Sequence, residues 1–363
     1  MKRKAFFSIF IIIMSMILTS CSQKEEYGKY DVEFFDVFDT ITKIVVYEKS
    51  EKLANEELYK MREEFSELNK LFDKYHTYEG MNNLKTINDN AGIQPVKVDD
   101  RLFHLIKTSV DYYYTLSDKT DIAIGPAVDL WNEYRNLYSD GDTKEQVKAK
   151  MGSYIPTEEE LNALRPFMNI KDVVINDSDK SIYLSKKGMQ LDVGSVAKGY
   201  ATELVAENAE KNGVKSAVIS AGGNVRVIGH PLDGRDNFEV AIENPYKNND
   251  EGANFLTVLK VNNSSVVTSG DYQRFFTVDN KRYCHIIDPT TLMPTRNFRS
   301  VSVITKDSFL CDYLSTSLFL MSYEDGLKLC NKLGVDAIWA FSNGEVKYTK
   351  GAEKMVIKQW KTT

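Results

Sequence analysis

The sequence contains little cysteine, histidine and proline. Its 363 residues include four cysteines, four histidines and eight prolines. No Cys-x-x-Cys pair and no Cys/His cluster has the spacing of metal ligands, so neither a zinc site nor a disulfide framework is indicated. The low content of proline and glycine excludes collagen-like and disordered chains. A net charge of −6 argues against a general binder of nucleic-acid backbones.

An apolar run lies at the N-terminus, behind three basic residues. This run, Ala5 to Leu18, fits the hydrophobic region of a signal peptide. It is too short to cross a bilayer comfortably. It leads into Leu18-Thr19-Ser20-Cys21, which resembles the lipobox of bacterial lipoproteins, where cleavage precedes the cysteine and the cysteine is acylated.

We therefore expect a lipoprotein signal peptide over residues 1–20, lipidation of Cys21, and a polar tether over residues 21–31. These features predict a chain that is lipid-anchored at the cell membrane, on its extracytoplasmic face. The alternative is an uncleaved signal anchor in which Cys21 is incidental. The other three cysteines are expected to be packed thiols.

Residues 32–363 are interpreted as one α+β domain. Helix-like and strand-like segments alternate without a long linker or a repeat of fixed period. Apolar residues three and four apart predict a helix over 51–72, and Asn343-Gly344 is a strong hairpin signal. This mixed order predicts a largely antiparallel sheet. The other predicted helices cover about 99–116, 196–211, 309–321 and 322–333, with a short one beginning at 157; the predicted strands cover 41–47, 173–175, 181–184, 217–219, 238–242, 255–261, 265–268, 274–278, 283–287, 300–304, 336–341 and 345–348.

A glycine and a serine precede the helix predicted at 196–211. The segment reads Leu191-Asp192-Val193-Gly194-Ser195-Val196-Ala197-Lys198. A helix N-terminus offers free N–H groups and a positive dipole end, and Lys198 adds a cation, which suits a phosphate. The segment lacks the spacing of a P-loop and of a dinucleotide fingerprint. The alternative is an ordinary serine cap with a solvated lysine.

Three polar residues at helical spacing share one face of the helix predicted at 309–321. Asp312, Ser315 and Thr316 could present hard oxygen ligands of the kind that Mg²⁺ prefers. The alternative is a polar surface, but the very apolar flanks favour a trio that faces a cleft. By residue type, His285 is the best general acid–base candidate, although a single histidine beside a strand is often structural.

Several further segments complete an ordered set of motifs. The set consists of Tyr78 with 82–88, 121–131, 191–200, Gly222-Gly223, 268–272, 285–289 and 312–316. In this order, the segments resemble the ApbE family, the FAD:protein FMN transferases, over about residues 36–350. The resemblance implies an α+β fold of the ApbE type (T-fold-like), with a mixed, largely antiparallel sheet and packed helices.

The resemblance also implies an activity and the residues that perform it. The family cleaves FAD and attaches FMN through a phosphoester to a Ser or Thr of a target flavoprotein, and AMP leaves. FAD is then a substrate, Mg²⁺ a cofactor, and extracytoplasmic flavoproteins the partners. The implied flavin contacts are Phe38 and Tyr78, and His285 would be the base. The rest of FAD would contact Lys119, Thr120, Asp121, Asp192, Lys198 and Ile287. The implied Mg²⁺ ligands are Asp312, Ser315, Thr316 and the Ser195 carbonyl.

Two departures from the family pattern are visible. Leu292 stands where the family usually has glycine in the turn after His285, and Phe38-Asp39-Thr40 stands where many members read Met-Gly-Thr. No acceptor motif of the family's kind occurs in the chain, so we expect it to modify other proteins. The alternatives are a Mg²⁺-dependent FAD pyrophosphatase giving FMN and AMP, a non-catalytic flavin-binding lipoprotein, and a solute-binding lipoprotein with two similar α/β lobes.

Overall fold

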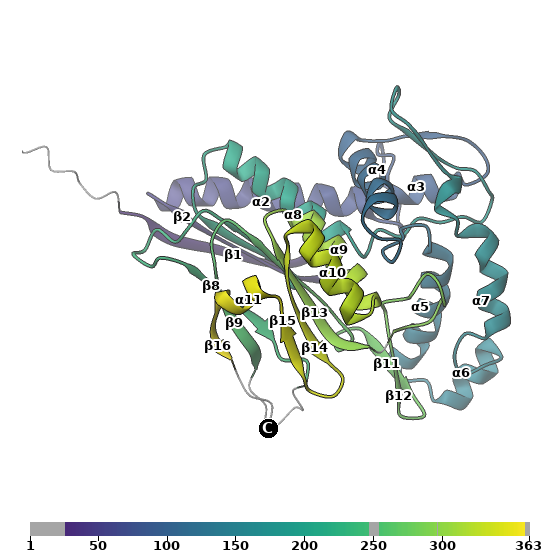
Figure 1. Ribbon diagram of the computed structural model, residues 1–363. Helices are drawn as coiled ribbons and strands as arrows, with labels where there is room; N and C mark the ends of the chain where they lie inside the picture. Colours follow the sequence, from purple (N-terminus) through teal and green to yellow (C-terminus); the bar gives the residue numbers. More distant parts are fainter. Residues whose placement is uncertain (1–25, 247–253, 296, 360–363) are drawn as a thin grey trace, which may run out of the picture.

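The computed structural model describes residues 26–246, 254–295 and 297–359 (Figure 1). Its centre is an eight-stranded sheet in which every neighbouring pair of strands is antiparallel. The strand order is β1-β2-β6-β7-β10-β13-β14-β15. In chain order, these strands are β1 Gly28–Val37, β2 Thr40–Glu48, β6 Ala217–Ala221, β7 Asn224–Ile228, β10 Ser265–Gly270, β13 Phe298–Thr305, β14 Asp336–Phe341 and β15 Val346–Tyr348.

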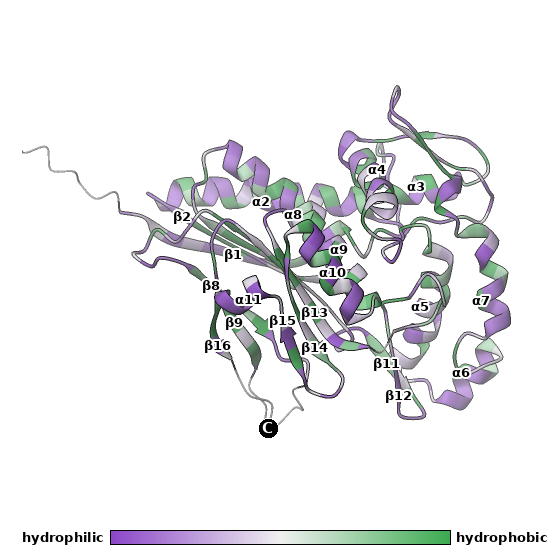
Figure 2. Cartoon of the chain, in the orientation of Figure 1, coloured by the Kyte–Doolittle hydropathy of each residue, from purple (hydrophilic) through white to green (hydrophobic). Residues whose placement is uncertain are grey.

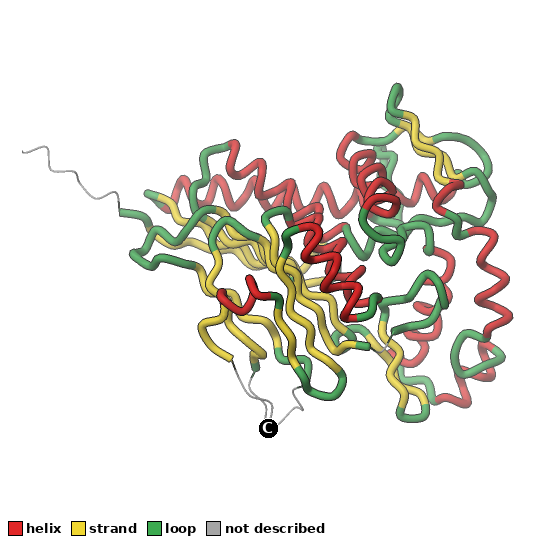
Figure 3. Tube along the Cα trace, in the orientation of Figure 1, coloured by secondary structure: helices red, strands yellow, loops and turns green. Residues whose placement is uncertain are grey.

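Helices cover one face of this sheet (Figures 1 and 3). They are α2 (Glu51–Phe72), α8 (Ala197–Lys211), α9 (Ser308–Leu320) and α10 (Tyr323–Leu333). In α2 an apolar stripe packs on β2, and Ser50 caps the first turn by accepting from the N–H of Leu53. Nearly every residue of α9 is buried, so this helix lies inside the core rather than on its surface.

A smaller sheet covers part of the opposite face. Side chains that alternate along the central strands, such as Val227, Val266 and Ile304, form the second core layer with it. The hydropathy colouring in Figure 2 shows hydrophobic residues along the strands of the central sheet. The smaller sheet has the order β16-β9-β8, with β8 Phe238–Glu243, β9 Phe255–Val261 and β16 Val356–Gln359, and the short helix α11 Lys350–Met355 precedes β16.

A helical lobe is inserted between β2 and β6 and lies beyond one end of the central sheet (Figure 3). The hairpin β11–β12 joins it, because Phe276 and Tyr283 of this hairpin pack on Trp131 of the lobe. The elements are α3 Leu84–Asp89, β3 Val96–Lys97, α4 Asp100–Thr115, α5 Gly125–Ser139, α6 Lys144–Met151, α7 Glu158–Leu164, 3₁₀ turns Arg165–Phe167 and Ile170–Asp172, β4 Val173–Asn176, β5 Ser181–Leu184, β11 Phe275–Val278 and β12 Lys281–Cys284.

The predicted α+β class with an antiparallel sheet is confirmed. Two of the predicted assignments need correction. Residues 28–31, assigned to the tether, belong to β1, because their backbone pairs with β2. The strand predicted at 283–287 is observed as β12, Lys281–Cys284. Its last ladder pair is Cys284 with Phe275, and beyond that pair the backbone contact continues through the hydrogen bond from the N–H of His285 to the carbonyl oxygen of Arg274. The predicted signal peptide and Cys21 lie outside the described residues.

Two smaller observations concern the membrane and the thiols. Within the described ranges, no helix is both long enough and apolar enough to cross a bilayer. Cys284, Cys311 and Cys330 are buried free thiols, as expected. Burial raises the pKa of the Cys284 thiol to about 11, so this thiol stays protonated and is not a nucleophile.

Candidate active site

Asp312 lies at the crossing of α8 and α9, where its carboxylate is held by two donors. Its Oδ2 accepts a hydrogen bond from the backbone N–H of Gly199 at 2.8 Å and from Asn224 Nδ2 at 2.9 Å. The side chain is 4% exposed. Burial raises the pKa of Asp312, while Lys198 and the two hydrogen bonds lower it. Among the described residues, Lys198 is the one cation that lowers the pKa of this carboxyl, so a second cation would stabilise the ionised carboxylate further.

Gly199 makes this crossing possible because it has no side chain. A Cβ at Gly199 would lie 2.4 Å from the Cβ of Asp312 and 2.5 Å from the carbonyl oxygen of Ser308. Both neighbours belong to α9, which is packed on all sides. The close approach of the two helices therefore depends on glycine at this position.

We expect Gly199→Ala to destabilise the fold by about 1–3 kcal/mol, because the new methyl group must push α8 and α9 apart. Chemical denaturation of the full chain measures the change. Gly194→Ala is the matched control, because a Cβ there meets only a carboxylate oxygen of Asp192, at 3.0 Å. Equal stability of the two variants would contradict the role assigned to Gly199.

The hydroxyl groups predicted from α9 gather beside this carboxylate. Ser315 Oγ lies 2.7 Å from Ser269 Oγ, and Thr316 Oγ1 lies 3.4 Å from the same atom. Ser315 Oγ also donates to the carbonyl oxygen of Asp312 at 2.9 Å. Ser269 is the second-last residue of β10, and the sequence analysis did not propose it as a ligand. The structure thus brings four oxygen-bearing side chains to one place.

These residues fit a magnesium ion. Hydrogen bonds within the described ranges use only Oδ2 of Asp312, which leaves its Oδ1 available. The same ranges contain no group of three or more His, Cys, Asp and Glu that could hold a metal, so a zinc-type site is not present there. One carboxylate with hydroxyl and carbonyl oxygens, completed by water and substrate phosphate, is the ligand set that Mg²⁺ accepts.

The turn before α8 lies beside the oxygen cluster. The helix begins after Val196, which makes no side-chain cap, so the alternative of a serine cap at Ser195 is wrong. Ser195 is partly exposed, and its carbonyl stays a predicted metal ligand. Lys198 in the first turn acts electrostatically on both Asp312 and His285. A cation at a helix N-terminus beside hard oxygen ligands suits a bound phosphate.

Asp192 anchors this turn to the end of α2. Its Oδ1 accepts from the N–H of Gly194 at 2.8 Å, and its Oδ2 pairs with Lys74 Nζ at 2.7 Å. Lys74 also pairs with Asp129 of α5. Burial alone lowers the pKa of Lys74, but Asp192 and Asp129 outweigh it and raise that pKa. Lys74 and Asp129, which the sequence analysis did not select, therefore fix the position of Asp192.

His285 follows β12, and its ring is oriented by one backbone carbonyl. The backbone N–H of His285 donates to the carbonyl oxygen of Arg274 at 3.1 Å, and Nδ1 lies 3.3 Å from the same oxygen. A carbonyl only accepts, so Nδ1 carries the proton and Nε2 keeps a free lone pair. The pKa of His285 is lowered, first by desolvation from the surrounding protein and then by the charges of Arg274 and Lys198. The residue still keeps exposed surface, so an acceptor can reach it. The neutral ring can accept a proton at neutral pH.

The two predicted flavin contacts each bind to residues at the C-terminal end of α2. Phe38 occupies the turn between β1 and β2 with φ of +52°, and its N–H donates to Asn69 Oδ1 at 2.8 Å. Its ring lies 6.3 Å from that of Phe72. Tyr78 donates from its hydroxyl to Asp73 Oδ2 at 2.8 Å, and burial together with that carboxylate raises the pKa of Tyr78 to about 12. The aromatic rings are thus held by the end of one helix.

The remaining predicted FAD contacts lie in the segment after α4 or in the segment after β12. Lys119 Nζ lies 3.2 Å from Asp288 Oδ1 and 2.9 Å from Thr290 Oγ1. Thr120 is buried, and its hydroxyl bonds to α9, so this side chain supports that helix. Asp121 is also buried, and desolvation raises its pKa to about 7. Ile287 is buried beside Pro294, and its contact with FAD stays a prediction, as does that of Thr120.

The turn after His285 forms even though it lacks the glycine. Leu292 adopts a φ of +59°, a left-handed conformation that glycine takes at no steric cost. Its N–H donates to the carbonyl oxygen of Asp288 at 2.7 Å, and its own carbonyl accepts from the indole N–H of Trp131 at 2.8 Å. The side chain is 1% exposed. Burial of the Leu292 side chain and the hydrogen bond from the indole therefore stabilise this turn, at a position where the family pattern has glycine.

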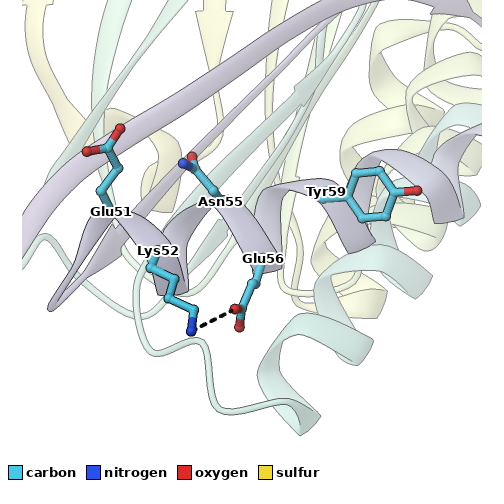
Figure 4. Close-up of a pocket in the computed structure, with 5 residues that line it drawn as sticks. All are labelled: Glu51, Lys52, Asn55, Glu56 and Tyr59. Carbon is cyan, nitrogen blue, oxygen red and sulfur yellow. Dashed lines mark ion pairs between the residues drawn. The ribbon is translucent and has the colours of Figure 1, made fainter.

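A surface depression elsewhere carries none of these residues. It lies on the outer side of α2 and is lined by charged and amide side chains and a tyrosine (Figure 4). Lys52 and Glu56 form an ion pair within it at 4.0 Å. All its lining residues come from one helix, so it offers a ligand contacts from one side only. The depression is therefore not part of the candidate site.

The fold and the site together define a class of enzyme. Hard oxygen ligands, a lysine at a helix N-terminus and a neutral histidine are what phosphoryl transfer requires, since that chemistry depends on positioning and on neutralising charge. The family model of the ApbE family matches residues 38–339. The chain belongs to the ApbE family, and the resemblance found in the sequence is confirmed.

Several relatives and solved structures are similar to this chain. A protein of Klebsiella pneumoniae named FAD:protein FMN transferase is 30% identical over 262 residues, covering 72% of this chain and 75% of the relative. One of Treponema pallidum with the same name is 29% identical over 279 residues, covering 74% and 73%. The crystal structure of the ApbE protein of Thermotoga maritima superimposes with a TM-score of 0.77 at 25% identity, covering 92% of this chain and 100% of that one.

Proposed function

We propose that this chain is a Mg²⁺-dependent FAD:protein FMN transferase that acts at the extracytoplasmic face of the cell membrane. The names of its curated relatives support the transfer of FMN from FAD to protein. The observation that carries the proposal is the buried Asp312 carboxylate, held by Gly199 and Asn224 beside three hydroxyl groups. Asp312, Ser315, Thr316 and the Ser195 carbonyl would hold Mg²⁺, which supplies charge neutralisation on the pyrophosphate when bound.

Different residues of the chain perform different parts of the reaction. Lys198 and the start of α8 bind the pyrophosphate of FAD, and the aromatic rings of Phe38 and Tyr78 hold the flavin. Nε2 of His285 takes the proton of the acceptor hydroxyl. The hydroxyl oxygen forms a bond to the FMN phosphorus, the bond from that phosphorus to the AMP oxygen breaks, and AMP leaves with the electron pair.

The direct test combines the full chain in detergent with FAD, Mg²⁺ and a candidate acceptor flavoprotein. Intact mass and in-gel flavin fluorescence are expected to show one FMN attached to the acceptor, and EDTA is expected to abolish the labelling. Release of FMN and AMP without labelling would favour the pyrophosphatase. Unchanged FAD would favour a flavin-binding lipoprotein and contradict both the transferase and the pyrophosphatase.

The location is part of the same proposal. It is supported by the basic and apolar segment at the N-terminus and by the lipobox-like sequence that ends in Cys21. An acylated chain would meet extracytoplasmic flavoproteins at the membrane surface, and it would depend on exported FAD. Metabolic labelling with a palmitate analogue tests the anchor, and a Cys21→Ser chain that is labelled equally would contradict it.

A further inference from the structure

The candidate site contains more positive charge than Lys198 alone supplies. Arg274 and Arg135 both act electrostatically on the ring of His285, together with Lys198. Arg274 lies just before β11, and Arg135 lies on α5. Within the described ranges, none of these three cations forms an ion pair with a carboxylate, whereas the neighbouring Arg282 pairs with Asp271. The uncompensated charge is therefore local to His285.

The position of Arg274 is fixed at two points. Its carbonyl oxygen lies 3.3 Å from Nδ1 of His285, which places its backbone against the proposed base. Its guanidinium donates to the carbonyl oxygen of Asp39 at 3.4 Å, in the turn that also contains Phe38. The side chain therefore spans from the histidine to the turn on the flavin side. A guanidinium has five donors, and this contact uses one of its nitrogens, so the others stay free to bind an anion.

Arg135 of α5 lies within electrostatic range of Arg274. Desolvation and the charge of Arg274 lower the pKa of Arg135 below its usual value. Arg135 is half-buried, and two like charges within electrostatic range repel each other. An anion bound by Arg274 would lessen that repulsion, and guanidinium groups donate charge-assisted hydrogen bonds to such an anion.

We propose that Arg274 and Arg135 form a phosphoryl-binding subsite beside His285, which holds the FMN phosphate during transfer. The inference rests on the proposed function. For proton transfer, the acceptor oxygen must lie within about 3 Å of His285 Nε2, and for attack it must lie within about 3 Å of the phosphorus. The phosphorus then lies within about 6 Å of the histidine ring. A guanidinium beside the same ring can therefore reach the phosphoryl oxygens. As the oxygen–phosphorus bond to the acceptor forms and the bond to AMP breaks, these oxygens carry the charge that the arginines neutralise.

The geometry distinguishes this subsite from the metal site. Asp312 and its hydroxyl neighbours lie at the crossing of α8 and α9, whereas Arg274 reaches from the histidine to the turn between β1 and β2. The two groups of charges would thus hold the two phosphates of FAD separately. The arginines are assigned to the phosphate that stays with the flavin, because Arg274 contacts the turn on the flavin side.

The test compares ligands that differ by one phosphate, with the full chain in detergent and Mg²⁺ present. Flavin fluorescence is titrated with FMN and with riboflavin, and AMP is titrated by competition. We expect Arg274→Met to weaken FMN binding at least about ten-fold while riboflavin and AMP binding stay within two-fold. Arg135→Met is expected to act in the same direction, and Arg274→Lys to keep part of the affinity for FMN.

Arg282→Met is the matched control, since Arg282 belongs to the same hairpin and pairs with Asp271; it should leave all three affinities unchanged. Unchanged riboflavin binding shows that the Arg274 variant is folded. An equal loss for riboflavin and FMN, a loss for AMP alone, or an effect confined to the KM for the acceptor protein would each overturn the assignment. These binding measurements need no turnover, so they separate failure of the subsite from failure of the proposed transfer.

Discussion

Asp312→Asn is expected to lower the rate of FMN transfer by at least about a thousand-fold. Asp312 supplies the carboxylate of the oxygen cluster, and its neighbours Ser269, Ser315 and Thr316 contribute only neutral hydroxyl groups. An asparagine side chain has the same shape and can still accept from Gly199, so the variant should fold. The loss is measured as single-turnover labelling of an acceptor over a range of Mg²⁺ concentrations.

The thermal stability of the same variant gives an independent measurement. Burial raises the pKa of Asp312, which means that the ionised carboxylate destabilises the metal-free fold. We therefore expect the metal-free Asp312→Asn chain to melt at the same or a higher temperature than the wild type. Added Mg²⁺ should raise Tm of the wild type and leave that of the variant unchanged. Asp325→Asn, at the exposed start of α10, is the control that should respond to Mg²⁺ like the wild type. Full labelling by Asp312→Asn at saturating Mg²⁺ would refute the metal site.

His285→Gln is expected to lower transfer by about 10²–10⁴-fold, the usual contribution of a general base, while FAD binding stays within two-fold. Glutamine can still donate to the carbonyl oxygen of Arg274, but it has no basic nitrogen at the position of Nε2. Single-turnover labelling measures transfer, and quenching of flavin fluorescence measures FAD binding. His104→Gln, on an exposed part of α4, is the control. Labelling by His285→Gln at the wild-type rate would exclude the role of base.

The dependence of the wild-type rate on pH follows from the same environment. A general base acts in its unprotonated form, so the rate falls when the pH drops through the pKa of His285. Desolvation and the charges of Arg274 and Lys198 lower that pKa, so the fall should come well below pH 6.5. We therefore expect no loss of rate due to this residue between pH 5 and 8.

Much of the fold was predictable because its helices carry local signals. The helix predicted at 51–72 has the bounds observed for α2, since its apolar stripe and the Ser50 cap are both visible in the sequence. The helix α5 was not predicted from the sequence, although Gly125-Pro126 begins it. Proline in the first helical turn is in fact a start signal, as it is here. For α6, the capping box of Thr143 and Gln146 was a usable signal.

The candidate site was predictable only where its residues share one element. Asp312, Ser315 and Thr316 were selected from their spacing on one helix, and the structure confirms that they lie on α9 together. Ser269 and Asn224 were not assigned to the same site, because their contacts with α9 depend on which strands lie beside that helix. Asn224 and Asp312 are 88 residues apart in the sequence. No local pattern encodes such a contact. The flavin and metal contacts named from the resemblance stay predictions.

The order of the strands in the central sheet determines when the site can exist during folding. Strand β2 pairs with β6 only after the whole helical lobe has been synthesised between them, so that Thr42 lies beside Ala221. Gly199 and Asp312, which meet at the site, are 113 residues apart. Closing loops of this length is slow, and it follows the formation of local helices. A partly folded chain would therefore possess helices without a catalytic centre, so it could not cleave FAD before the sheet had closed.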